Sequence, residues 1–130
     1  MTLDEFFSGR EESRRIFDVL HDTIDALGSV EIRVTKSQVA FRRGKAFAWA
    51  WVPGMYLRGG QAPLVLTLSF AKLNASPRWK EVVNPSPGRF THHLELHSGS
   101  EIDGEVRSWL REAWEAAAQT IPGDELPRRR

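Results

Sequence analysis

Seven residues near the middle of the chain, Ala46–Val52, alternate between alanine and aromatic side chains before ending in valine. Successive side chains of a β-strand point to opposite faces, so this period of two predicts a strand rather than a helix. Three rings, Phe47, Trp49 and Trp51, would lie on one face, and three alanines would lie on the other. An alanine face permits the close approach of a helix. Pro53 and Gly54 end the strand.

The same alternation occurs in three other stretches, residues 30–34, 64–70 and 90–97. Residues 37–42 are a further strand candidate, and residues 43–45 have the composition of a tight turn. Strands joined by tight turns pair in antiparallel fashion. The chain is therefore expected to form an antiparallel sheet of about four to five strands.

A long loop is expected over residues 71–89, because this stretch contains Pro77, Pro85, Pro87 and Gly88. Loops of this length are uncommon in compact domains and often carry function.

Helical periodicity precedes the strands. The stretches Thr2–Glu5 and Ser8–Glu11 each have the spacing of a capping box, with a hydroxyl side chain at the N-cap and a carboxylate three residues later. We expect a helical turn over 3–7 and a helix from Arg10 to Leu27. The apolar residues that form one stripe along this helix are Ile16, Phe17, Leu20, Ile24 and Leu27.

A final helix follows the last strand. Ser100 is its expected N-cap, and Pro122 and Gly123 are expected to end it. Its apolar stripe consists of Ile102, Val106, Trp109, Leu110, Ala113 and Ala117. The fold class is therefore α+β, with the sheet packed between the N-terminal and C-terminal helices. An alternative is that both helices cover a single face and leave the tryptophans of the other face open.

The length of 130 residues corresponds to one domain, which we place at residues 1–121, with a polar and flexible tail at 122–130. The absence of cysteine excludes disulfides, thiolate metal sites and cysteine nucleophiles. The start lacks the basic and apolar regions of a signal peptide, and no apolar run reaches membrane-spanning length. We expect a cytoplasmic protein that does not enter a membrane.

Charge is unevenly distributed along the chain. Residues 30–97 carry ten Lys and Arg against three Asp and Glu, whereas the flanking segments 1–29 and 98–130 are acidic. Basic side chains neutralise phosphates and aromatic rings stack on bases, so such a surface suits an anionic ligand or a nucleic acid. An alternative is that the basic loops pair with the acidic helices. The candidate ligand-binding residues are Arg43, Lys45, Arg78, Trp79, Lys80 and Arg89.

Two further hypotheses come from the strands. His93, Glu95 and His97 would project from one face of a strand, and imidazole and carboxylate are ligands for zinc or iron, so they are candidates for a metal site or for the centre of an enzyme. The usual explanation of an aromatic stripe such as Phe47, Trp49 and Trp51 is core packing. Trp49 and Trp51 would instead form a surface for a protein partner if the helices pack on the alanine side. No nucleophile motif, catalytic set or cofactor motif is present, so we expect a non-enzymatic binding module, as a monomer or homodimer.

Several stretches together resemble a bacterial family known as domain of unknown function 5655. They are residues 34–43, 47–49, 77–83, 92–96 and 109–114, which occur in the order typical of the family. The resemblance covers residues 2–118 and implies an α+β fold and a cytoplasmic location. It implies no reaction and no catalytic residues. Some members carry a "predicted transport protein" label, which no feature of this sequence supports.

Overall fold

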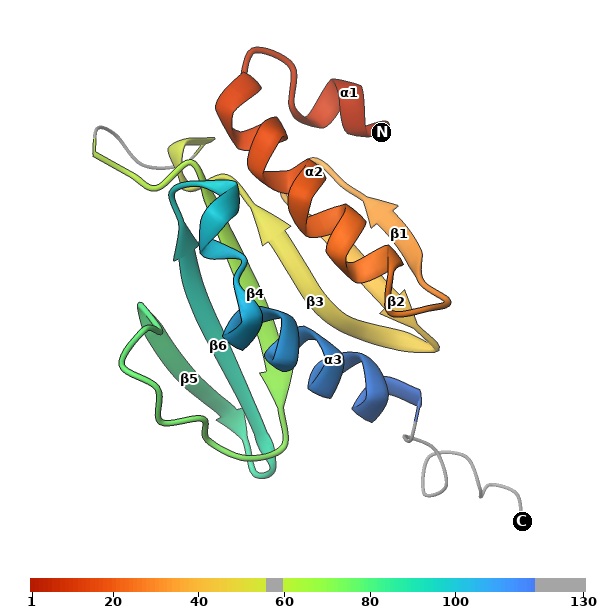
Figure 1. Cartoon of the computed structure of the whole chain (residues 1–130), viewed down its shortest axis with the longest axis vertical. Helices are drawn as coiled ribbons and strands as arrows, with labels where there is room; N and C mark the ends of the chain where they lie inside the picture. The colour runs from red at the N-terminus through yellow and green to blue at the C-terminus, as the bar shows by residue number, and fades with distance from the viewer. Residues whose placement is uncertain (56–59, 119–130) are drawn as a thin grey trace.

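The computed structural model describes residues 1–55 and 60–118, which form one six-stranded antiparallel sheet with helices packed on it (Figure 1). The strand order is β1-β2-β3-β4-β6-β5. The strands are β1 (Glu31–Val34), β2 (Val39–Arg43), β3 (Lys45–Trp51), β4 (Leu64–Phe70), β5 (Glu81–Ser86) and β6 (Arg89–Leu96). The helices are α1 (Leu3–Phe6), α2 (Glu11–Asp25) and α3 (Gly104–Ala118), and two short 3-10 turns are η1 (Pro53–Met55) and η2 (Gly99–Glu101). The predicted α+β class is confirmed, with six strands rather than four to five.

Both long helices lie on the same face of the sheet, so the sheet is not sandwiched between them (Figure 1). The apolar stripes of α2 and α3 join one face of the strands in a single core. Phe17 of α2, for example, stacks on Phe41 of β2 with ring centroids 5.8 Å apart. The described residues contain no helix long and apolar enough to cross a lipid bilayer.

The alanine side of β3 is the side that the helices cover. Ala48 and Ala50 are fully buried in the core, whereas Trp49 and Trp51 are only half-buried. Because alanine adds little thickness to the sheet, α3 can pack closely against β3. The helices therefore cover one face, as in the alternative given above, and the two tryptophans lie on the other.

Phe47 does not share the face of Trp49, contrary to the simple alternation. The register between β2 and β3 shifts there, because Phe41 pairs with Ala48 while the next residue, Arg42, pairs with Ala46. Phe47 is therefore an extra residue in a β-bulge, which disrupts the alternation of side chains. Its ring is buried in the core beneath the helices.

The segment 71–89 is not wholly a loop, because its second half contains the edge strand β5. Glu81 pairs with His93 and Val83 with Thr91. The pairing is irregular between Val83 and Ser86, where Pro85 cannot donate a backbone hydrogen bond. Pro85 is typical of a loop, but here it lies in a strand at the edge of the sheet, where proline is tolerated.

The helix starts are partly as expected. Thr2 and Glu5 form the expected capping box. The N-cap of α2 is Arg10, with no side-chain hydrogen bond, so the second expected capping box is absent. Ser100 lies within η2 rather than capping α3. Asp103 precedes α3, and its carboxylate accepts a hydrogen bond from the Val106 amide at 3.1 Å, which is the geometry of an N-cap.

Candidate functional site

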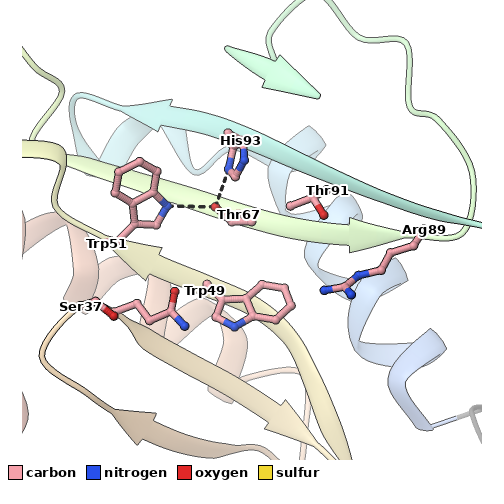
Figure 2. Close-up of a pocket in the computed structure, with 8 residues that line it drawn as sticks. Ser37, Trp49, Trp51, Thr67, Arg89, Thr91 and His93 are labelled. Carbon is pink, nitrogen blue, oxygen red and sulfur yellow. Dashed lines mark hydrogen bonds between the residues drawn. The ribbon is translucent and has the colours of Figure 1, made fainter. Parts of the chain in front are cut away.

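The helix-free face of the sheet carries a hollow of about 350 Å³, which is within the range of small-ligand sites (Figure 2). Its floor is formed by β3, β4 and β6, and one side is formed by the turn before β2. The residues that line it are Ser37, Gln38, Trp49, Trp51, Thr67, Arg89, Thr91 and His93.

The register of the sheet explains why these residues meet. Trp49 lies opposite Thr67, and Thr67 lies opposite His93. Cross-strand partners in an antiparallel sheet are neighbours on one face, with Cβ atoms roughly 5 Å apart. Residues from three strands that are distant in the sequence therefore form one row across the helix-free face.

A hydrogen-bonded relay links three of these side chains (Figure 2). The indole Nε1 of Trp51 donates to the Thr67 hydroxyl at 3.0 Å. The Thr67 oxygen is 2.8 Å from Nδ1 of His93. Indole is a donor only, so the Thr67 hydroxyl hydrogen is available for Nδ1. We assign the neutral imidazole the tautomer with its proton on Nε2, as this hydrogen-bond pattern favours.

His93 is held in its neutral form. Desolvation by the surrounding side chains lowers the pKa of His93 below its usual value, and the negative charge of Glu81 only partly opposes this effect. The edge of the Trp51 ring meets the imidazole, with centroids 6.2 Å apart and planes at 89°. The relay therefore fixes the orientation of both rings.

Arg89 alone, of the described residues that line this hollow, carries a permanent charge. It comes from the first residue of β6 and also lines a second hollow of about 590 Å³. The second hollow lies between the β2–β3 turn, the start of β6 and α3. Its lining residues include Lys45, Phe47, Trp49, Phe70, Arg89 and Ala117.

The structure uses three of the six predicted ligand-binding residues within the fold, namely Trp79, Arg78 and Arg43. Trp79 is 8% exposed and stacks on Trp109 of α3. The Nη1 atom of Arg78 donates to Asp103 at 3.1 Å and to Glu105 at 2.8 Å. These carboxylates raise the pKa of the Arg78 guanidinium above its usual value. For Arg78, the alternative of a basic loop paired with an acidic helix thus holds.

Arg43 is the third of these, and the remaining three lie in two places. Arg43 stacks over the Trp114 ring, with its Cζ 3.4 Å from the ring centroid, and donates to the Trp114 carbonyl. Lys80 is exposed at the start of β5 and lines neither hollow. Lys45 and Arg89 are exposed and meet at the second hollow, so they are the predicted pair that the fold brings together.

The three metal-ligand candidates do not form a ligand set. His93 is engaged with Thr67, and Nε2 of the exposed His97 lies 3.8 Å from a Glu95 oxygen. Within residues 1–55 and 60–118, no group of three His, Cys, Asp or Glu side chains is placed to hold a metal ion.

Sequence reasoning missed several residues of the first hollow. Gln38, Thr67 and Thr91 carry no chemical signature of their own, and only the strand order brings them beside the tryptophans. The alternation of residues 90–97 already placed Thr91 and His93 on the face opposite Leu94. The sequence alone did not show which strands lie next to this one in the sheet.

Comparison with known proteins gives one match. A family model described as a domain of unknown function (DUF5655) matches residues 3–117. No curated protein and no solved structure matches the chain.

Proposed function

The chain belongs to the DUF5655 family, whose description assigns no activity, and we propose from its helix-free face that it is a binding module for an anion that carries a planar ring. The simplest biological ligand of this kind is a nucleoside monophosphate. The observation that carries the proposal is the hollow in which Trp49 and Trp51 lie beside Arg89.

The two tryptophans supply the ring-binding part. Trp49 and Trp51 are alternate residues of β3, so their rings emerge on one face at a spacing of roughly 7 Å. Both are half-buried, although the helices leave this face uncovered. An aromatic ring at the surface of a sheet binds the face of a base with little regard to its identity.

The polar groups of the hollow favour an anion. The Arg89 guanidinium and Nε2 of the neutral His93 are hydrogen-bond donors. Along the described lining there is no aspartate or glutamate to repel a phosphate. A ligand with acceptor oxygens at one end and a ring at the other fits these groups. We also propose that the protein is cytoplasmic. A chain without cysteine agrees with a reducing compartment, and nucleotide ligands are present there.

The test compares three probes by ¹H–¹⁵N NMR of the indole groups: adenosine monophosphate, adenosine and inorganic phosphate. Adenosine monophosphate is expected to shift the Trp49 and Trp51 indole signals and to leave those of the buried Trp79 and Trp109 in place. Adenosine should bind more weakly, because it offers Arg89 no charge, and phosphate alone should not move the indoles.

The matched variants are Arg89→Ala and Lys80→Ala, which each remove one exposed cation from the part of the chain that follows β4. Arg89→Ala should weaken adenosine monophosphate about fivefold, the upper range for an exposed ion pair, and leave adenosine unchanged. Lys80→Ala should change neither. If no probe moves the Trp49 and Trp51 signals, or if Lys80→Ala is the variant that weakens binding, this site is not the ligand site.

A further inference from the structure

The two hollows adjoin at Trp49 and Arg89, which line both of them, and we call the two together the groove. The groove therefore runs from Trp51 and His93, past Trp49 and Arg89, to Lys45 at the β2–β3 turn. Along β3 the distance from Lys45 to Trp51 is on the order of 20 Å at strand spacing.

The second hollow repeats the chemistry of the first. It has its own exposed cation, Lys45, and two buried rings, Phe47 and Phe70, in its wall. Its helical side consists of alanines of α3, which contribute no charge. For the described residues, neither hollow is lined by a carboxylate. The whole groove therefore has cations at two points, and its partly exposed rings are those of Trp49 and Trp51.

Two of the three carboxylates of segment 30–97 lie beside the His93 end of this path, because Glu81 pairs with His93 and Glu95 follows His93 two residues later on β6. Glu31 is on the edge strand β1, Glu81 is on the edge strand β5, and Glu95 is next to the end of β6. None of them lines either hollow. A polyanion would thus be repelled near Glu81 and Glu95 and accepted toward Arg89 and Lys45, which gives it a defined direction.

We infer that the groove takes single-stranded nucleic acid, with one nucleotide on Trp49 and Trp51 and the next phosphate toward Lys45. This inference rests on the proposed function, since it extends that ligand from one nucleotide to several. A positively charged groove with aromatic rings along it is the usual means of holding a single strand without reading its sequence. Stacked nucleotides rise roughly 3.4 Å each along a strand, so the groove exceeds the length of a single one.

The test measures fluorescence anisotropy of labelled oligothymidylates and oligouridylates of increasing length, at low salt, beside NMR titration of the mononucleotide. Affinity should rise with length until the groove is filled and then level off. It should fall as salt is added, because phosphate contacts release counterions. At least one of the two series should show this rise with length, and affinity that does not rise with length in either series overturns the inference.

Lys45→Ala isolates the extension from the first site. This lysine is exposed beside the β2–β3 turn, so its removal leaves the core intact. The variant should weaken long oligonucleotides about fivefold and lower the steepness of the salt dependence, while the mononucleotide is unaffected. Lys80→Ala is the control, because it removes an exposed lysine that lines neither hollow.

The outcomes separate the two proposals. If the mononucleotide binds at Trp49 and Trp51 but oligonucleotides bind no more tightly, the extended groove is wrong and the proposed function stands. If neither binds, both are wrong. If light scattering shows a dimer whose Trp49 and Trp51 signals are shielded, the face is occupied by a second copy of the chain and the inference is overturned.

Discussion

Trp79 stacks on Trp109, with ring centroids 4.3 Å apart and ring planes inclined by 28°. The same Trp79 ring contacts the buried His92 at 4.8 Å, and its Nε1 donates to Asn74 at 3.0 Å. The loop before β5 is therefore attached to α3 and β6 by an aromatic cluster. The tryptophan that the sequence suggested as a stacking platform for a ligand is a platform for the protein itself.

Trp79→Ala should destabilise the fold by about 3–5 kcal/mol, as large aromatic truncations in a core do. Urea unfolding followed by far-UV circular dichroism measures this. Leu73→Ala, which truncates a side chain that is 58% exposed in the same loop, is the control and should cost less than about 0.5 kcal/mol. A loss of similar size in both variants would contradict the packing described for Trp79.

Arg78→Ala should lower stability by about 1 kcal/mol at most, because its ion pairs with Asp103 and Glu105 are close to solvent. Added salt should reduce the difference from the unmodified protein. The same variant should bind ligand as the unmodified protein does. A tenfold loss of affinity with unchanged stability would return Arg78 to the candidate site.

Acid should destabilise the protein through His92. Burial lowers the pKa of His92, while its Nε2 accepts a hydrogen bond from the Asn74 amide at 3.0 Å. The unfolded chain takes up a proton near the ordinary value of about 6.5, whereas the folded chain does not, so this stability is present above that pH and is lost as pH falls below it.

The loss for each such histidine is at most about 1.4 kcal/mol per pH unit. Urea unfolding at about pH 7.5 and about pH 5.5 brackets the usual histidine range. His93 has a lowered pKa as well, and contributes with the same sign. His92→Gln should be less stable at neutral pH but show a smaller difference between the two conditions. An unchanged difference in this variant would exclude His92 as the source.

Thr67→Val should uncouple Trp51 from His93. The variant keeps the shape of the side chain but removes the oxygen that both rings contact. We expect a loss of about 1 kcal/mol, the usual value of such a hydrogen bond, and a shift of the Trp51 indole signal. Thr91→Val is the control, because Thr91 lines the same hollow outside the relay. Equal effects of the two variants would mean that the relay contributes nothing specific.

Much of the fold follows from periodicity. The alternation in residues 64–70 and 90–97 correctly placed Leu66, Leu94 and the fully buried His92 on the core side, although Val65 and Thr67 on the opposite side are buried as well. The helix stripes were predicted for the same reason, since an amphipathic pattern encodes which side faces the core. Two local features were not predicted from the sequence. They are the bulge at Phe47 and the strand β5, whose prolines are typical of a loop.

The site was harder to predict because it depends on contacts between distant parts of the chain. Arg78 meets its carboxylates, and Trp79 meets Trp109, only after α3 has folded onto the sheet. Local composition made both residues suitable for a ligand, and nothing in the neighbouring sequence indicated their partners. Lys45 and Arg89 are basic residues as Arg78 is. Unlike Arg78, they share a hollow that no carboxylate lines, in the part of the chain that the structure describes.

The placement of Pro85 has a consequence for how this protein can associate. It lies in β5, which is one margin of the sheet, and the opposite margin is the short β1, which carries Glu31 and Arg33. Proline and charged side chains both discourage another strand from adding to a sheet. Growth of the sheet into fibres is therefore blocked at its sides, so a large surface without helices can stay open to solvent without making the protein prone to aggregate.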